Sequence, residues 1–493
     1  MSDLGSGNGR VREPRIVIIG AGVAGISAAH VLREQGFADI RVLEKGDDVG
    51  GVWFWNRYPG LTCDVPSQIY QFGFAPKPDW SHIWASGEEI QRYHRDVVES
   101  LGLLPLIRFR TEVTEARFSD STGEWILTTN DGGELNADFV LCATGVLHNP
   151  AYPDTPGLDS FRGPVVHTAR WDSELPTENR RIAVLGTGST GVQVVSALSK
   201  DAASLTHFVR SPQWVLWAPM GLRQIPGIAT LLRTAPRLHD RVYQGLLRCS
   251  QILADITTRP SWRRRAVQAY ARWSLRLGVR DERLRDALTP DYQPLCKRQV
   301  VSGTYYRALR RPNVELVTRG IREVTADGIV TEDGAHHEVD MIVLATGFRA
   351  HDYMRPMRIT GREGITLDEQ WASGPRAYRM TAIPGLPNLF TVLGPNSPTG
   401  SISLQFSAEL TSRYIAQWVD RFARGEVDRV EVTEEATRAF NEQVADAMGP
   451  TVWNTGCNSW YLTEDGSVDL WPFDQATMVR MLSEPEDAHF HIR

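Results

Sequence analysis

Hydrophobic and polar positions follow the same order of patterns at two places in the chain. Arg15–Gly20 is a short apolar run typical of a strand, Ile26–Gln35 has helical spacing, and Asp39–Glu44 is again typical of a strand. The order recurs further along the chain, over Arg181–Gly186, Val192–Ser199 and Ser204–Arg210. Each stretch is typical of the start of a βαβ unit, so the sequence predicts an α/β fold with two Rossmann-like dinucleotide-binding domains.

A glycine-rich turn joins the strand to the helix in each unit. The first turn carries Gly20, Gly22 and Gly25, and the second is Gly186-Thr187-Gly188-Ser189-Thr190-Gly191. Glycines at these spacings allow a tight turn, close approach of the backbone to a pyrophosphate, and close packing of helix on strand. A fortuitous glycine cluster is the alternative for either turn alone, but strand, turn, helix and second strand agree at both places.

The residue that ends the second strand has opposite charge in the two units. It is Glu44 in the first unit and Arg210 in the second. In such units this residue meets the adenosine ribose, where a carboxylate accepts from a free 2′-hydroxyl and an arginine pairs with a 2′-phosphate. The sequence therefore predicts FAD or NAD at the first site and NADPH at the second.

Two further apolar runs end in Ala-Thr-Gly, at Phe139–Gly145 and Met341–Gly347. A strand that closes on a small residue and a glycine lets the chain leave one domain close to a cofactor. We therefore expect these runs to mark crossovers between the domains. An ordinary buried strand that stops at a glycine is the alternative.

Residues 214–288 follow a different pattern, with apolar residues three and four apart among many arginines. This spacing predicts a helical insertion within the second dinucleotide-binding domain. Its charges, including Arg263-Arg264-Arg265, are typical of a solvated face, with binding to a membrane surface as the alternative.

Composition narrows the classes of function. A net charge of −6 gives no general attraction to nucleic acid, and no run of 18 apolar residues is long enough to cross a membrane. The first residues are polar and glycine-rich and lack the apolar core of a signal peptide. We therefore expect a cytoplasmic protein without nucleic-acid or integral-membrane partners, as a monomer or a homo-oligomer.

The cysteines bear on redox chemistry. There are five of them, scattered and without a CxxC pair, so we expect neither a disulfide framework nor a dithiol redox centre. No HExxH motif or Cys/His cluster predicts a metal. A flavin reduced by a nicotinamide must pass its electrons on. Dioxygen is the simplest acceptor that remains, leading either to substrate oxygenation or to unproductive decay.

The segment between the two units carries a longer motif. Phe161, Gly163, His167 and Trp171, followed by Asp172, fit the FxGxxxHxxxW fingerprint of the Baeyer-Villiger monooxygenases. A second pattern of that family is met by Gly50-Gly51, Trp53, Tyr58-Pro59-Gly60 and Asp64. With both glycine turns and Trp460 near the C-terminus, the chain resembles this family over nearly its whole length.

The resemblance implies an FAD-dependent, NADPH-consuming enzyme that inserts one oxygen atom from O2 next to a ketone carbonyl, giving an ester or lactone. The family forms a peroxide at the flavin C4a position. Arg298 matches the arginine that stabilises the negative charge of the reaction, and a guanidinium suits this role because it stays charged. Asp64 matches the carboxylate that pairs with it. Outside these motifs both would be ordinary surface residues.

The resemblance also implies the contacts of the two cofactors. Arg210, Ser211 and Lys297 match residues that hold the 2′-phosphate of NADPH, Gln193 matches one that faces the nicotinamide cofactor, and Trp460 matches a tryptophan that closes the site. Lys297 is one of only four lysines in the chain. Residues that match flavin contacts are Gly51, Val52, Trp53, Trp55, Tyr70 and Val113, with core packing as the alternative. His167 matches a hinge residue that supports cofactor movement.

We therefore divide the chain by the pattern and the resemblance together. The predicted parts are a disordered tail (1–14), an FAD-binding domain (15–150 and 382–493), an NADPH-binding domain (151–213 and 289–381) and the helical insertion (214–288). We expect the substrate pocket to be lined by the insertion, the Leu393–Leu404 loop and the segment near Trp460. A flavin monooxygenase acting on nitrogen or sulfur is the first alternative function, and a non-enzymatic redox sensor is the second.

Overall fold

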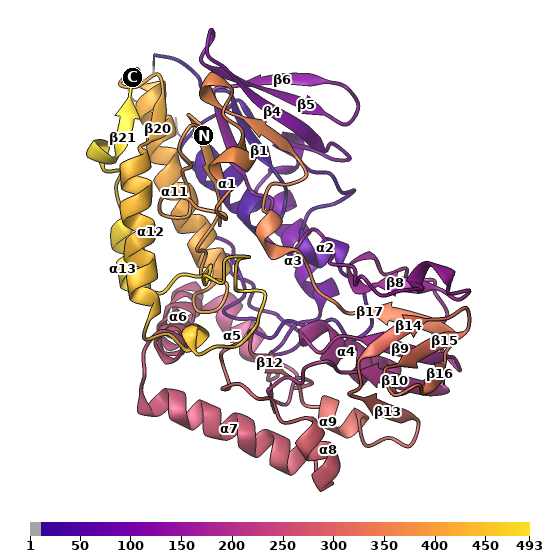
Figure 1. The fold of residues 1–493 in the computed structure, drawn as a ribbon. Coiled ribbons are helices and arrows are strands. Elements are labelled where there is room, and N and C mark those ends of the chain that lie inside the picture. Colours follow the sequence, from indigo (N-terminus) through magenta and orange to yellow (C-terminus); the bar gives the residue numbers. More distant parts are fainter. Residues whose placement is uncertain (1–10) are drawn as a thin grey trace.

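Two parallel five-stranded sheets organise the computed structural model, which describes residues 11–493 (Figure 1). The first sheet has the order β19 (Leu389–Thr391), β7 (Phe139–Cys142), β1 (Ile16–Ile19), β2 (Ile40–Leu43) and β3 (Ile107–Arg108). The second has the order β13 (Val314–Val317), β10 (Ser204–Phe208), β9 (Arg181–Leu185), β17 (Met341–Leu344) and β8 (Val165–His167). The two predicted Rossmann-like units are confirmed.

Each glycine turn leads from the central strand of a sheet into a helix. Helix α1 (Val23–Glu34) follows β1, and α4 (Ser189–Leu198) follows β9. Both helices begin three residues earlier than the hydrophobic spacing predicted, directly after Gly22 and Gly188, which occupy the N-cap positions without a side-chain cap. The first backbone N–H groups of each helix are thus left for a ligand.

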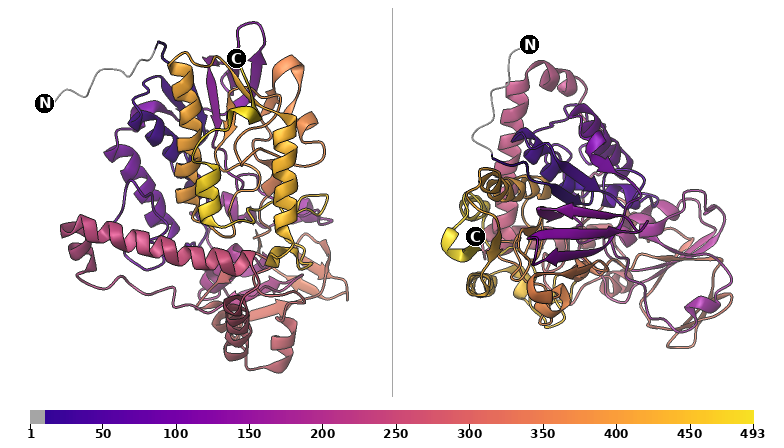
Figure 2. Two further views of the ribbon diagram at one scale, coloured as in Figure 1. Left: turned by 90° about the vertical axis from the view of Figure 1, so that its left-hand side faces the viewer. Right: turned by 90° about the horizontal axis from the view of Figure 1, so that it is seen from above.

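The C-terminal part of the chain returns to the first sheet. Strand β19 pairs with β7, and α11 (Leu404–Ala423) packs on α1, so their apolar faces share one core. Helices α3 (Gly87–Ser100), α12 (Glu434–Met448) and α13 (Gln475–Met481) contribute to the same core, and α10 (Leu367–Gln370) belongs to the core on the opposite face of the sheet. The short helix α2 (Val52–Trp55) precedes α3 in the chain. Figures 1 and 2 show the C-terminal helices together on one side of this sheet. The residue limits of the two domains stay a prediction.

Smaller sheets complete each unit. Strand β18 (Arg358–Thr360) joins β4 (Val113–Ser119), β5 (Glu124–Thr129) and β6 (Glu134–Ala137). The others are β14 (Ile321–Val324) with β15 (Gly328–Thr331) and β16 (His336–Glu338), β20 (Val430–Val432) with β21 (Phe490–Ile492), and β11 (Val215–Leu216) with β12 (Val300–Val301). Helix α9 (Tyr305–Ala308) packs on α4.

The predicted insertion is helical. It contains α5 (Ile228–Thr234), α6 (Pro236–Thr258), α7 (Trp262–Gly278) and α8 (Glu282–Ala287). Helix α6 crosses below the C-terminal helices in the left view of Figure 2, and α7 lies along the lower edge of the molecule in Figure 1. Among the described residues, no helix has both the length and the apolar character needed to cross a membrane. The cytoplasmic location stays a prediction.

The two Ala-Thr-Gly runs lead into the connections between the sheets, as expected. The segment after β7 and the segment after β17 lie antiparallel, with an isolated bridge between Pro150 and Phe348. The N–H of Ala151 donates to the Gly347 carbonyl at 2.9 Å, and the Thr346 hydroxyl donates to the Ala151 carbonyl at 2.6 Å. The two crossovers are therefore tied to each other between the sheets.

The prediction of a disordered tail over residues 1–14 is wrong for Val11 and Arg12. Residues 1–10 lie outside the described residues, but Val11 donates from its N–H to the Ala423 carbonyl. The Arg12 guanidinium lies 3.5 Å from the centre of the Phe422 ring and pairs with Asp428 at 2.7 Å. Residues that looked polar and unanchored in the sequence are held here by the end of α11.

Glycine is required where helix and strand are closest. A Cβ added to Gly25 would lie 1.8 Å from the Gly20 carbonyl oxygen, and one added to Gly191 would lie 2.1 Å from the Gly186 oxygen. A Cβ on Gly20 or Gly186 would in turn meet the carbonyl of Ala143 or Ala345 at the end of the neighbouring strand. The third glycine of each turn therefore fixes the distance between helix and sheet.

Replacing Gly191 by alanine should destabilise the second unit by about 1–3 kcal/mol, the usual cost of overpacking. Gly245→Ala is the matched control, because Gly245 is an exposed residue within α6 with nothing within 4 Å of an added Cβ. That change should stabilise α6 by about 0.5–1 kcal/mol. Denaturant unfolding of both variants tests this, and equal stability of Gly191→Ala and the wild type would contradict it.

Candidate active site

One cavity of about 1220 Å³ is shared by the two sheets. It is larger than the usual pocket for a single small ligand, which is about 300–1,000 Å³. Both glycine turns, both Ala-Thr-Gly segments and the Trp460 loop line it. The predicted site residues on its wall are Gly20, Gly22, Glu44, Gly51, Val52, Trp53, Trp55, Asp64, Tyr70, Val113, Gly186, Thr187, Gly188, Ser189, Gln193, Arg210, Ser211, Lys297, Arg298 and Trp460.

Glu44 is held at the first glycine turn. Its carboxylate accepts from the N–H of Ala21 and from the N–H of Gly46, both at 2.7 Å. Burial raises the pKa of Glu44, and the two backbone donors oppose that rise. Glu44 is one of the residues that line the cavity, and each carboxylate oxygen has a further lone pair that can accept from a hydroxyl group.

Arg298 and Asp64 form an ion pair on the cavity wall. Arg298 follows the insertion in the chain, whereas Asp64 ends the segment after α2, so the pair joins residues 234 apart. Arg298 Nη2 lies 3.0 Å from Asp64 Oδ1, and Arg298 Nε lies 3.3 Å from Asp64 Oδ2. The charge of Asp64 raises the pKa of Arg298 well above its usual value, against the opposing effect of burial. The guanidinium is therefore a permanent cation.

A third contact fixes the other end of this guanidinium. Arg298 Nη1 donates to the carbonyl of Thr399, which lies in the Leu393–Leu404 loop. Leu393, Thr399 and Leu404 of that loop line the cavity. The arginine is thus held from both sides while part of its side chain, 35% exposed, faces the open space.

A cationic group lies beside the second glycine turn. Lys297 Nζ is 3.4 Å from the Ser211 hydroxyl, and the hydroxyl of Thr187 donates to the Ser211 carbonyl at 2.7 Å. Burial lowers the pKa of Lys297, the charge of Arg210 lowers it further, and Asp291 opposes both. A bound anion would offset the repulsion between Lys297 and Arg210.

Gln193 has contacts that the sequence did not suggest. Its Oε1 accepts from the Tyr58 hydroxyl at 3.0 Å, and its Nε2 donates to the Thr62 carbonyl at 2.8 Å. An added Cβ on Gly60 would lie 2.9 Å from the Gln193 carbonyl oxygen. Gln193 therefore ties α4 to the segment that ends at Asp64, in addition to lining the cavity.

Aromatic side chains form much of the remaining wall. Trp53 Nε1 donates to the Tyr70 hydroxyl at 3.0 Å, with the two rings edge to face. Trp460 is 37% exposed and its ring centre lies 4.6 Å from that of Tyr461. A half-exposed tryptophan at the rim can cover a ligand without first being pulled from a core.

The fingerprint residues lie outside the cavity wall. Phe161 and Trp171 are buried in cores of the second unit, and an added Cβ on Gly163 would lie 2.3 Å from the Asp340 carbonyl. His167 ends β8 beside β17, and its Nδ1 accepts from the Ala169 N–H at 3.1 Å. Asp172 accepts from the Glu174 N–H. These contacts shape the connection, and the hinge role of His167 stays a prediction.

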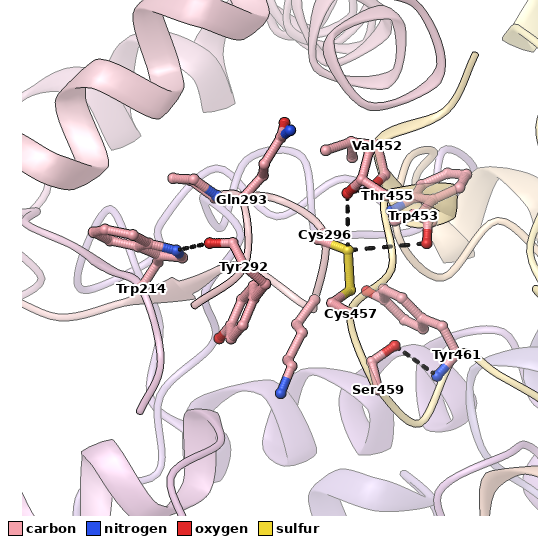
Figure 3. The surroundings of a disulfide bond; sticks show 12 residues. Trp214, Tyr292, Gln293, Cys296, Val452, Trp453, Thr455, Cys457, Ser459 and Tyr461 are labelled. Atoms are coloured by element: carbon pink, nitrogen blue, oxygen red, sulfur yellow. Dashed lines mark hydrogen bonds between the residues drawn. A yellow bond between two sulfur atoms is a disulfide. The ribbon is translucent and has the colours of Figure 1, made fainter. Parts of the chain in front are cut away.

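The expectation of a chain without disulfides is wrong. Cys296 and Cys457 form a disulfide between residues 161 apart, next to the Thr455 hydroxyl (Figure 3). Cys296 directly precedes Lys297 and Arg298, and Cys457 lies on the segment that leads to Trp460. The odd number of cysteines and their wide spacing along the chain gave no sign of this pair, because only the fold brings the two segments of the chain together.

One expected part of the wall is also wrong. Among the described residues, none that lines the large cavity comes from 214–288, so the described part of the insertion does not line it. The lining residues that sequence reasoning missed include Tyr58, Cys63, His148, Tyr152 and Gln213. Tyr58 and Cys63 lie within the motif that runs from Gly50 to Asp64, and this position could have indicated that they line the cavity.

Comparison with known proteins agrees with this arrangement. Residues 13–221 match the family "FMO-like: Flavin-binding monooxygenase-like". An uncharacterized monooxygenase of Mycobacterium tuberculosis is 48% identical over 98% of this chain and 97% of its own. A Baeyer-Villiger monooxygenase of Streptomyces coelicolor is 38% identical over 97% of this chain and 92% of its own. A crystal structure of OTEMO in complex with FAD and NADP superposes with a TM-score of 0.87, at 25% identity, over 99% of this chain and 100% of its own.

The two parallel sheets, the shared cavity and the family match define the class of this protein as a flavin-binding monooxygenase. Within that class, the chain belongs to the Baeyer-Villiger monooxygenase family.

The disulfide can be tested by counting thiols. The denatured, unreduced protein should have three reactive thiols, those of Cys63, Cys142 and Cys249, and reduction should raise the number to all five. Cys457→Ser should have the same number of thiols before and after reduction, because Cys296 then lacks its partner. Five thiols in freshly purified, unreduced wild-type protein would contradict the cross-link.

Proposed function

We propose that this protein is an FAD-containing, NADPH-dependent Baeyer-Villiger monooxygenase that inserts one oxygen atom of O2 next to a ketone carbonyl, giving an ester or lactone. The observation that carries the proposal is the Arg298–Asp64 pair on the wall of a cavity that both glycine turns line. The route through the flavin that the resemblance implies stays a prediction.

The first glycine turn fits FAD. Gly22 and Gly51 approach so closely that an added Cβ on Gly51 would lie 3.0 Å from the Gly22 Cα, leaving the backbone open to a pyrophosphate beside the α1 N-terminus. Glu44 lines the same cavity, and its carboxylate would accept from ribose hydroxyls. Tyr70, Trp53 and Val113 offer apolar and aromatic contacts to the ring system. Bound there, the flavin supplies the redox chemistry.

The second glycine turn fits NADPH. Arg210 and Lys297 offer two cations, and Ser211 offers a hydroxyl, at the end of the second strand of its unit. A 2′-phosphate would restore charge balance to this group, whereas the 2′-hydroxyl of NADH would not. NADPH is therefore the cofactor that the charges favour.

Arg298 acts on the ketone oxygen. Negative charge develops there when the carbonyl carbon is attacked, and a permanent cation lowers the energy of that charge without giving up a proton. Asp64 positions the guanidinium through two of its donors, and the Thr399 carbonyl positions a third. Trp460, a partly exposed residue of the cavity wall, would cover the bound nicotinamide cofactor.

The first test is product analysis. With NADPH, ¹⁸O2 and a panel of linear, cyclic, aryl and steroidal ketones, we expect esters or lactones that carry one labelled oxygen. Arg298→Ala should lose about 10²- to 10³-fold in ester formation, the usual cost of removing a transition-state donor. Reduction of the flavin by NADPH without oxygen should persist in this variant.

The control for this change is Arg438→Ala on α12, which removes an exposed arginine that pairs with Glu442 and is not part of the cavity wall. It should form ester at the wild-type rate. Ester formation by Arg298→Ala at that same rate would refute the assigned role. A panel that yields only hydrogen peroxide, or only oxidised thioethers when these are supplied, would refute the function itself.

Cofactor preference is tested separately. Arg210→Ala removes one charged partner of the 2′-phosphate and should raise the KM for NADPH about tenfold or more, with little change for NADH, because a charged hydrogen bond contributes about 1.5–3 kcal/mol. Lys200→Ala, an exposed lysine after α4, is the control. Steady-state oxidation of both nicotinamides measures this, and equal losses with NADPH and NADH would contradict the phosphate assignment.

A further inference from the structure

Helix α7 is apolar on the side that faces solvent. Trp262, Ala266, Tyr270, Trp273 and Leu277 follow one another at spacings of four, four, three and four residues, so they form one stripe along the helix. All five are exposed, with Trp262 at 68%, Trp273 at 50% and Leu277 at 59%. We name these five residues the α7 stripe.

The stripe is not the face by which α7 packs. The buried residues of this helix are Arg264, Gln268, Ala271, Ser274 and Leu275, on the opposite side. A helix on the surface of a protein normally turns a polar face outward. Here the outward face carries two tryptophans, a tyrosine and a leucine, and the inward face carries an arginine.

The chain next to the stripe extends it. The Tyr270 hydroxyl donates to the carbonyl of Trp217 at 2.7 Å, and Trp217 is itself 48% exposed. Tyr270 and Trp273 stack at 5.5 Å between ring centres. A contiguous exposed apolar patch of this kind is typical of a surface that binds a protein, a membrane or a ligand.

The sequence around the stripe is rich in arginine, and Asp286 and Asp291 share a hollow with Arg272 and Arg276 on one flank. Residues 223–277 contain 11 arginines and two aspartates, in a chain whose net charge is −6. On α7 itself, Arg263 lies on one flank of the stripe and Arg265, Arg272 and Arg276 lie on the other. Among the described residues, none of these four arginines has a carboxylate within ion-pair distance, unlike Arg181 or Arg421 elsewhere on the surface.

Arg264 shows that the arginine triplet has two roles. Its guanidinium is turned inward and donates to the carbonyls of Ile256, Thr257 and Pro450. Arg263 and Arg265 on either side stay exposed. The inward arginine holds α7 to α6 and to the C-terminal part of the chain, and the outward ones are left for a partner.

We propose that the α7 stripe and its flanking arginines form a binding surface for the interface of an anionic lipid bilayer. Aromatic and aliphatic side chains enter the boundary between headgroups and acyl chains, and arginines beside them pair with lipid phosphates. A second copy of the chain is disfavoured as the occupant, because a two-fold contact would bring the same unpaired arginines together. A nucleic acid offers phosphates but no apolar layer for Trp262, Trp273 and Leu277.

The test uses the full-length flavoprotein with vesicles of phosphatidylcholine alone and of phosphatidylcholine mixed with phosphatidylglycerol. We expect co-sedimentation only with the anionic vesicles, weakening as salt is added, with a blue shift of tryptophan fluorescence. The double variant Trp273→Ser, Leu277→Ser should bind about tenfold or more weakly, since each removed side chain loses its apolar burial.

A second variant, with Arg263, Arg265 and Arg276 changed to Gln, should lose binding and most of its salt dependence. Leu104→Ser is the control, an exposed leucine outside the insertion, and it should bind as the wild type does. The proposal is overturned if either the double variant or the arginine variant binds anionic vesicles as well as the wild type does. It is also overturned if the wild type binds neutral and anionic vesicles equally well. The proposal is also overturned if these variants bind vesicles as the wild type does but lose dimer formation or binding to duplex DNA.

Discussion

The ion pair between Arg298 and Asp64 is the constraint on which the site depends. Asp64 follows the first glycine unit in the chain and Arg298 follows the second, so their contact brings the two halves of the molecule to one wall. Lys297 turns towards Ser211 on one side of this pair, and Cys296 is cross-linked to the Trp460 loop on the other. Three consecutive residues therefore couple the phosphate group, the permanent cation and the loop at the rim.

This coupling explains why the contacts of Gln193 matter. The side chain of Gln193 bonds Tyr58 and Thr62, which belong to the segment that presents Asp64. The helix that starts at the second glycine turn thus supports the carboxylate that holds Arg298. Gln193 therefore links the two units at a second point besides the ion pair.

The parts of the fold that sequence could predict are those set by residues close together in the chain. The glycine turns, the charges of Glu44 and Arg210, and the helical insertion all depend on spacings within about thirty residues, the length of a βαβ unit. The packing of Gly25 against Gly20 and of Gly191 against Gly186 follows from the same local pattern. The pairing of Asp64 with Arg298, which lies far away in the sequence, was predicted only from the resemblance to a known family.

The features that could not be predicted from the sequence depend on contacts between residues far apart in the chain. The disulfide joins two loops 161 residues apart, and neither cysteine has a neighbour that marks it. The insertion was expected to line the cavity because it interrupts the second unit, but α6 and α7 pack beside the site and present their free surface elsewhere. Residues 11–14 looked unanchored because their partner, the end of α11, comes some four hundred residues later.

Arginine has three different environments in this protein, and composition cannot separate them. Arg298 is held by a carboxylate beside a cavity, Arg264 is turned inward onto three carbonyls, and Arg263 and Arg265 are exposed beside an apolar stripe without a carboxylate partner among the described residues. The charge of Arg298 is available to a ligand in the cavity, whereas the guanidinium of Arg264 is used to hold helix α7 in place. An unpaired arginine next to exposed tryptophans has its charge and its apolar neighbours available together, which is the combination that distinguishes the α7 surface from a solvated face.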